Sequence, residues 1–208
     1  MIKNISNLLL WGGALAGGGS GGGGGGSEEG ATTADQLVEG GLAVINLPNA
    51  TKIRADIFNS VSELTDIYMP KVTSIGNSAF SQCRNLALTS LPSGLTSIGD
   101  NAFYSCSNLA LTSLPSGLTS IGSSAFYACR NLALTSFPSG VTSIGNNAFY
   151  TCTALKSLTF KGTPTSISST AFKNTSITTI NVPWAEGEVA NAPWGATAAT
   201  INYNYTGE

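Results

Sequence analysis

The side chains with the most chemical potential in this sequence are four cysteines, Cys83, Cys106, Cys129 and Cys152, spaced by 23 residues. Thiols at a fixed spacing could form disulfides, ligate zinc or act as nucleophiles. The sequence has no C-x-x-C pair and no histidine, so a zinc site lacks its usual ligands. Cysteines at the same position of successive repeats would point in the same direction, whereas a disulfide needs two cysteines whose Cα–Cβ bonds point toward each other. We therefore expect four buried free thiols.

No other set of residues forms a recognisable catalytic group. Without histidine, Ser-His and Cys-His arrangements are excluded. The acidic residues do not recur as a facing pair of general acid and base, and solvated surface is the simpler interpretation for them: Asp56, Glu63, Asp66, Glu186 and Glu188. We predict a non-enzymatic protein without a catalytic, cofactor or metal site.

The charge pattern argues against nucleic-acid binding. Net charge is -2 and charged residues make up 10% of the chain. Between Asn85 and Leu155 the only charged residues are Asp100 and Arg130. Binding to phosphates requires clustered Lys and Arg, which this stretch does not have.

The elements that would position these residues come from an internal repeat of 22 or 23 residues. The stretches 91–113 and 114–136 are near copies, and a third copy begins at Phe137. Leucines and isoleucines open each repeat from Leu42 to Ile177. One isoleucine ladder comprises Ile53, Ile75, Ile98, Ile121, Ile144 and Ile167, and one phenylalanine ladder comprises Phe58, Phe80, Phe103, Phe126, Phe149 and Phe172.

One repeat cannot bury its apolar face alone, so neighbouring repeats must stack and share a core. We predict an α/β repeat solenoid of about seven turns, each with short strands and a short helix or 3₁₀ turn. Gly76 and its equivalents would suit a left-handed turn after the isoleucine, and Asn77 and its equivalents would cap the short helix that carries Ala-Phe.

The repeated residues resemble a known family. The stretches 64–70 (LTDIYMP) and 72–80 (VTSIGNSAF) are similar to BspA-like leucine-rich repeats, also called the Treponema pallidum type. The resemblance covers roughly residues 42–183 and implies a leucine-rich repeat solenoid. In the middle copies the second leucine moves by one position, to Leu88 and Leu111, which leaves the local strand register open.

The N-terminal segment, residues 1–30, is an apolar stretch followed by a glycine-rich run. Residues 1–16 are similar to a signal peptide, but the apolar run is short and is interrupted by Gly12 and Gly13. It is also too short to span a membrane. We expect an uncleaved anchor or linker that contacts other protein chains of a larger assembly through Leu8, Leu9, Leu10 and Trp11.

The remaining boundaries follow from the repeat. Residues 31–63 are predicted to be an N-terminal capping turn, 64–183 the leucine-rich repeats and 184–208 a C-terminal cap. Trp184 and Trp194 lie beyond the last repeat and would cover the end of the core, with stacking on carbohydrate as the alternative. The cap resembles that of repeat proteins encoded by phages of gut bacteria.

The predicted surface is polar and weakly charged. Tyrosines follow the phenylalanine ladder, and threonines recur between the apolar strand positions: Tyr104, Tyr127, Tyr150, Thr89, Thr112 and Thr135. Such residues suit adaptable contacts with a host surface protein or glycan, although plain solvent exposure explains them equally well. The function that follows is binding, adhesion or decoration, on a bacteriophage virion or, alternatively, as a secreted adhesin on a bacterial surface.

Overall fold

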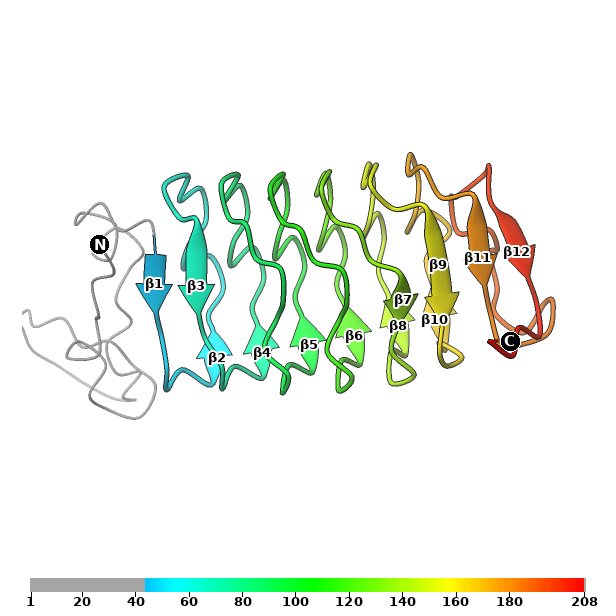
Figure 1. Ribbon diagram of the computed structural model, residues 1–208, viewed down its shortest axis with the longest axis horizontal. Helices are drawn as coiled ribbons and strands as arrows, with labels where there is room; N and C mark the ends of the chain where they lie inside the picture. Colours follow the sequence, from blue (N-terminus) through cyan, green and yellow to red (C-terminus); the bar gives the residue numbers. More distant parts are fainter. Residues whose placement is uncertain (1–43, 208) are drawn as a thin grey trace, which may run out of the picture.

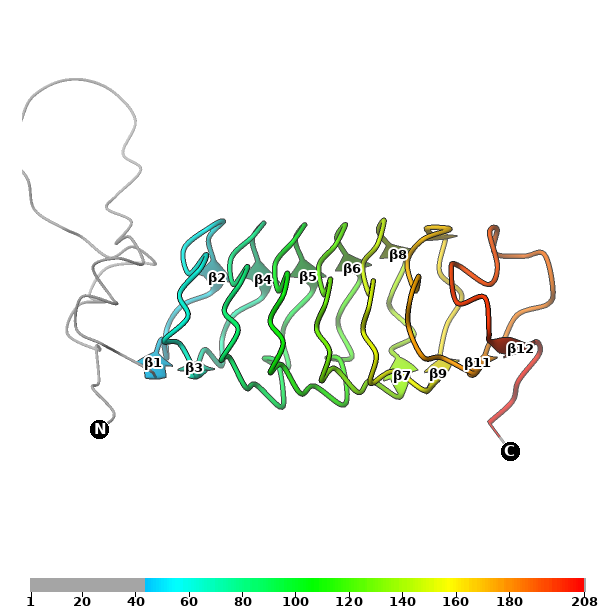
Figure 2. The same cartoon turned by 90° about the horizontal axis from the view of Figure 1, so that it is seen from above.

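The computed structural model describes residues 44–207, which form an elongated β-solenoid of about seven turns (Figure 1). The turns stack along one axis, so residues one repeat apart in the sequence lie side by side. Figure 2 shows that the strands gather on two opposite sides of the stack. The predicted repeat solenoid is therefore confirmed.

One side is a six-stranded parallel sheet that contains the isoleucine ladder. Its strands are β2 (Lys52–Ile53), β4 (Ser74–Ile75), β5 (Ser97–Ile98), β6 (Ser120–Ile121), β8 (Ser143–Ile144) and β10 (Ser166–Ile167). The register pairs identical residues, as with Ile75 beside Ile98 and Ile98 beside Ile121. Because the repeat length is nearly constant, every turn places the same side chain against its copy.

The opposite side is divided into two parallel sheets. The first pairs β1 (Val44–Asn46) with β3 (Asp66–Tyr68). The second runs in the order β7 (Ser136–Phe137), β9 (Ser157–Phe160), β11 (Thr179–Asn181) and β12 (Thr200–Asn202). Between them, where Leu88 and Leu111 occur, the described chain has no strand, although both side chains are buried. In these copies the second leucine follows the first by two residues instead of the three that separate Leu64 from Ile67, and the regular ladder is absent there.

The predicted helices are wrong: the described residues contain no α-helix or 3₁₀ helix, so the fold is a β-solenoid and not α/β. The segment that carries Ala-Phe has left-handed backbone at every fourth residue, for example φ 53° at Ser78 and 61° at Gln82. A left-handed residue at this interval interrupts a right-handed helix. The N–H groups of Ser78, Phe80 and Gln82 instead donate to carbonyls of the next turn at 2.8, 2.8 and 2.6 Å.

The roles predicted for the glycines and the residues after them are also corrected. None of the repeated glycines has a positive φ: Gly76, Gly99, Gly122 and Gly145. A Cβ on Gly99, however, would lie 2.7 Å from the backbone nitrogen of Asn77 in the previous turn. Glycine is therefore required for close approach of successive turns. The Asn77 Oδ1 atom accepts a hydrogen bond from the Asp100 N–H at 2.9 Å, so it links two turns and caps no helix.

The core is one continuous cluster that runs along the solenoid axis. Stacked phenylalanine rings form its centre, with centroids 5.2 to 5.4 Å apart from Phe58 to Phe172. At the C-terminal end the rings of Trp184 and Trp194 pack on Phe160 at 5.3 and 6.1 Å, and Trp194 is fully buried. The two tryptophans cover the end of the core as expected, and their burial excludes stacking on carbohydrate.

We expect Phe126→Ala to lower the free energy of unfolding by ~3–5 kcal/mol, because it leaves a cavity in the core. Phe126 is 0% exposed and stacks on Phe103 and Phe149. Urea unfolding measures the change. The control is Ser116→Ala at an exposed position of the same repeat, which should stay within ~0.5 kcal/mol of the original chain. A loss below ~1 kcal/mol in the Phe126 variant would contradict this account of the core.

Candidate functional site

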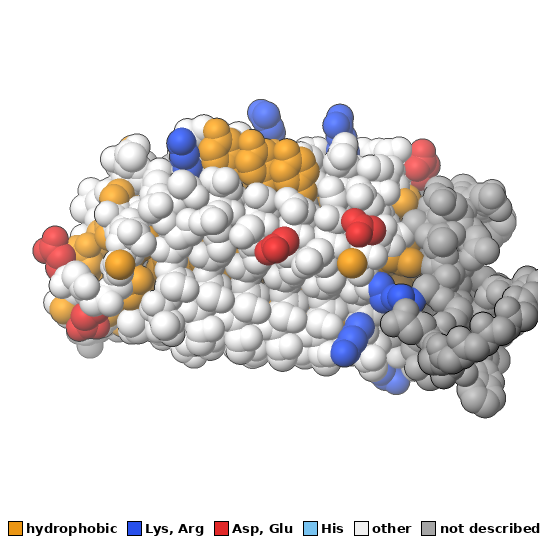
Figure 3. All heavy atoms as spheres, turned by 180° about the vertical axis from the view of Figure 1, so that it is seen from behind, with side chains coloured by type: hydrophobic (Ala, Val, Ile, Leu, Met, Phe, Trp, Pro, Cys, Tyr) orange, Lys and Arg blue, Asp and Glu red, His pale blue; other side chains and the backbone are white. Residues whose placement is uncertain are grey.

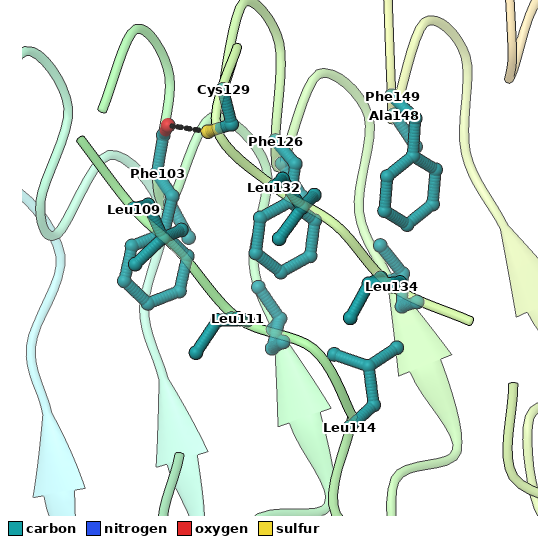
Figure 4. Close-up of a cluster of buried hydrophobic side chains, with 14 of the residues drawn as sticks. Phe103, Leu109, Leu111, Leu114, Phe126, Cys129, Leu132, Leu134, Ala148 and Phe149 are labelled. Carbon is teal, nitrogen blue, oxygen red and sulfur yellow. Dashed lines mark hydrogen bonds between the residues drawn. The ribbon is translucent and has the colours of Figure 1, made fainter. Parts of the chain in front are cut away.

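The four cysteines are free, buried thiols that face the core, as expected. Each Sγ atom donates a hydrogen bond to the carbonyl of a phenylalanine in the previous turn, as between Cys129 and Phe103 at 3.0 Å (Figure 4). Burial raises the pKa of Cys83 to about 12, against a smaller lowering by a backbone hydrogen bond from Val61, and burial also raises the pKa of the other three thiols. Since the thiolate is the nucleophilic form, these thiols are structural and not reactive.

Metal binding has no arrangement of ligands to support it in residues 44–207. Within that range, no group of three or more His, Cys, Asp or Glu side chains is placed to hold an ion. The described chain also contains no helix that is long and apolar enough to cross a bilayer. The candidate anchor residues Leu8, Leu9, Leu10 and Trp11 lie outside the described residues.

The predicted surface tyrosines form one feature, which we call the tyrosine strip: Tyr104, Tyr127 and Tyr150. Their rings stack in a row, with centroids 4.7 Å apart and interplanar angles of 13° and 5°. The strip is visible along the upper edge of the molecule in Figure 3. All three residues are half-buried, because each ring covers part of its neighbour.

Backbone hydrogen bonds between turns hold the strip in place. The N–H of Ser105 donates to the carbonyl of Tyr127 at 2.7 Å, and the N–H of Ala128 donates to that of Tyr150 at 2.8 Å. The ring spacing of 4.7 Å therefore equals the usual distance between hydrogen-bonded strands. The rings are preorganised by the scaffold, so a ligand need not order them.

The stacking decides which part of each tyrosine meets solvent. Both faces of the Tyr127 ring are covered, one by Tyr104 and the other by Tyr150. The strip consequently presents ring edges and hydroxyl groups rather than open aromatic faces. Burial between its neighbours, followed by repulsion from their phenolates, raises the pKa of Tyr127. A tyrosine hydroxyl is protonated at neutral pH in any case, and the raised pKa extends that state to higher pH, so the group can donate a hydrogen bond.

The second predicted set, Thr89, Thr112 and Thr135, is exposed but lies on a different part of the surface. Thr89 lines a shallow groove of about 470 Å³ beside Asp66 and Tyr68 of β3. This side of the solenoid belongs to the sheets of β3 and β9, whereas the tyrosine strip lies in the turn segment after the phenylalanine ladder (Figures 1 and 3). The tyrosines thus form a contiguous feature of their own, and the threonines do not extend it.

Sequence reasoning missed the residues that flank the tyrosine strip. Lys173 continues the tyrosine column by one turn, since its carbonyl accepts from the Thr151 N–H at 3.1 Å. The Asn174 Nδ2 group donates to the Tyr150 hydroxyl at 2.8 Å. Aligning residue 173 with residue 150 in the repeat would have indicated both neighbours.

A second groove, of about 520 Å³, follows the isoleucine sheet and is lined by the serines Ser74, Ser97, Ser120 and Ser143. Its floor includes Gly76, Gly99 and Gly122, whose lack of side chains is explained by the approach of the preceding turn. The groove is shallow. We interpret this groove as a consequence of how the turns stack and not as a ligand-binding site.

Stacked turns of 22 or 23 residues that share one continuous apolar core define a leucine-rich repeat solenoid. Six copies of the BspA type leucine rich repeat region match the sequence, over residues 40–149 and 73–191. The chain belongs to this BspA type leucine-rich repeat family, as its repeated residues suggested.

Solved structures agree on the fold. The chain is similar to the leucine-rich repeat protein of T. pallidum, with 24% identity and a TM-score of 0.56 over 79% of this chain and 71% of that one. It is also similar to the pneumococcal vaccine antigen PcpA, with 19% identity and a TM-score of 0.55 over 79% of this chain. It spans 42% of the pneumococcal protein's length. No curated protein matches the sequence.

We expect all four cysteines to resist a thiol reagent in the folded protein and to react once it is unfolded, because burial suppresses the thiolate. A colourimetric thiol titration in buffer and in denaturant measures this. The control is Ser116→Cys, which adds a thiol at an exposed position and should react in the folded state. Rapid labelling of the original chain in buffer, or fewer than four free thiols after unfolding, would contradict the assignment.

Proposed function

We propose that this chain is a non-enzymatic binding protein that is displayed on a biological surface and recognises its ligand through the tyrosine strip. The observation that supports this is the preorganised stack of Tyr104, Tyr127 and Tyr150 at 4.7 Å spacing. Stacked, half-buried aromatic residues supply contact area at low conformational cost, and tyrosine is enriched in binding surfaces for that reason.

Two settings for this display follow from the sequence. A bacteriophage virion is supported by the resemblance of the C-terminal cap to phage-encoded repeat proteins and by the anchor-like residues 1–30. A bacterial cell surface is supported by the similarity of residues 1–16 to a signal peptide. The mature N-terminus separates these settings, since cleavage before Gly17 would indicate secretion and retention of residues 1–16 would favour the virion.

Two matched triple variants test the binding proposal. Replacing the tyrosine strip by serine (Y104S, Y127S and Y150S) should lower retention of the labelled chain on immobilised mucin and on extracellular-matrix protein by about tenfold or more, because the aromatic contact area is lost. The comparison variant carries T89A, T112A and T135A and should bind as the original chain does. Equal binding by all three proteins would contradict the role of the strip. Circular dichroism of each variant checks that the solenoid is intact.

Deletion of residues 1–30 tests the display proposal. The solenoid's thermal stability should be nearly unchanged, because its core lies in later repeats. Incorporation into the parent particle, or retention on the cell surface, should be lost. A length-matched variant with serine at Leu8, Leu9, Leu10 and Trp11 isolates the apolar residues from the glycine run. Normal incorporation of both variants would place attachment on the solenoid instead.

A further inference from the structure

The side chains around the tyrosine strip are basic, which favours a negatively charged ligand. Basic side chains lie along the same edge of the molecule in Figure 3, and the acidic side chains visible on that face lie apart from the strip. In the sequence Arg130 follows Tyr127 by three residues, Arg84 holds the equivalent position two repeats earlier, and Lys173 continues the tyrosine column; all three are exposed. We call these three residues the basic rim. Within residues 44–207, no acidic side chain pairs with them.

The hydroxyl groups of the strip are available as hydrogen-bond donors. In the described chain the hydroxyls of Tyr104 and Tyr127 have no protein partner. The Tyr150 hydroxyl accepts a hydrogen bond from Asn174 at 2.8 Å, so its own proton remains free to point outward. Three donors in a row beside cations form an arrangement complementary to anionic oxygens.

The geometry also restricts how a ligand can bind. Because the faces of the Tyr127 ring are covered by its neighbours, a sugar cannot stack on it through its apolar face. An apolar protein side chain likewise finds no pocket between rings that are in contact. Hydroxyl donors and charge therefore add to the contact area of the ring edges, which favours a polar ligand with carboxylates over a protein partner that buries an apolar core.

We propose that the tyrosine strip and the basic rim bind a linear polysaccharide that carries carboxylate groups, with its chain lying along the solenoid axis. The hydroxyls of Tyr104, Tyr127 and Tyr150 donate to carboxylate and hydroxyl oxygens of successive sugar units. Arg130 and Lys173 supply the positive charge. This inference rests on the proposed function, because it names the ligand of the same surface.

The test uses the full chain with polygalacturonate as the probe. A neutral methyl ester of the same polymer and polyglutamate serve as comparison polymers, and biolayer interferometry measures the affinities. Polygalacturonate should bind at least about tenfold more tightly than its methyl ester, and added salt should weaken binding because exposed charges are screened.

Two sets of variants assign the contacts. The variant Y104F, Y127F and Y150F keeps the stacked rings and removes only the hydroxyls, and it should lose about tenfold or more in affinity. Charge reversal with R130E and K173E should do the same. The matched control K156E reverses an exposed charge in another segment and should bind more nearly like the original chain.

Three outcomes would overturn the inference. Equal affinity for polyglutamate would indicate an acidic peptide or simple attraction to any polyanion. Equal affinity for the methyl ester would remove the role of charge, and unchanged binding by the phenylalanine variant would remove the role of the hydroxyls. If the chain ignores every polymer yet still binds mucin or matrix protein through the strip, the inference fails and the proposed function stands. If it binds nothing, both fail.

Discussion

Hydrogen bonding between successive turns is the constraint on which the rest of this structure depends. Backbone N–H groups repeatedly donate to the carbonyls of the adjacent turn, as Phe103 does to Ala125 and Phe126 to Ala148 at 2.8 Å. These bonds fix the separation of the turns near the spacing of a parallel sheet, even in segments that are not strands. Each side chain then meets its own copy, so the identity of one repeated residue decides the composition of a whole column. Phenylalanine columns give a core, and a tyrosine column gives a surface.

Much of this architecture could be predicted from sequence because the repeat fixes the neighbours. The ladders of Ile98 and Phe103 identified the core, and the residues beyond the last repeat identified Trp194 as its cover. The helix between glycine and cysteine could not be excluded in this way. A short segment with a buried Ala-Phe pair suits a helical turn equally well until the destination of its N–H groups is known. The structure shows that Asn101 and Ser105 have left-handed backbone and that their N–H groups donate to carbonyls of the next turn.

The candidate surface was predictable in its residues but not in its geometry. The sequence indicated that Tyr104, Tyr127 and Tyr150 recur outside the core, which is true of any exposed column. It did not indicate that the rings stack in parallel at 4.7 Å, because a tyrosine could equally lie flat along its own turn. That difference changes the chemistry, since stacked rings offer edges and hydroxyls whereas flat rings offer faces. Lys173 was overlooked because it interrupts the tyrosine pattern.

The same stacking connects the stability of the solenoid with the way it can recognise a polymer. Tyrosines that cover one another reduce exposed aromatic surface, and so the strip is preorganised at the expense of open ring faces. Since residues 91–113 and 114–136 are near copies, each additional copy of this kind would add one hydroxyl and lengthen the strip by one ring spacing of 4.7 Å. A linear ligand with repeated units would gain contacts in the same increments. For the proposed polymer ligand, affinity would then rise with the number of tyrosine repeats, as expected when several weak contacts act on one chain.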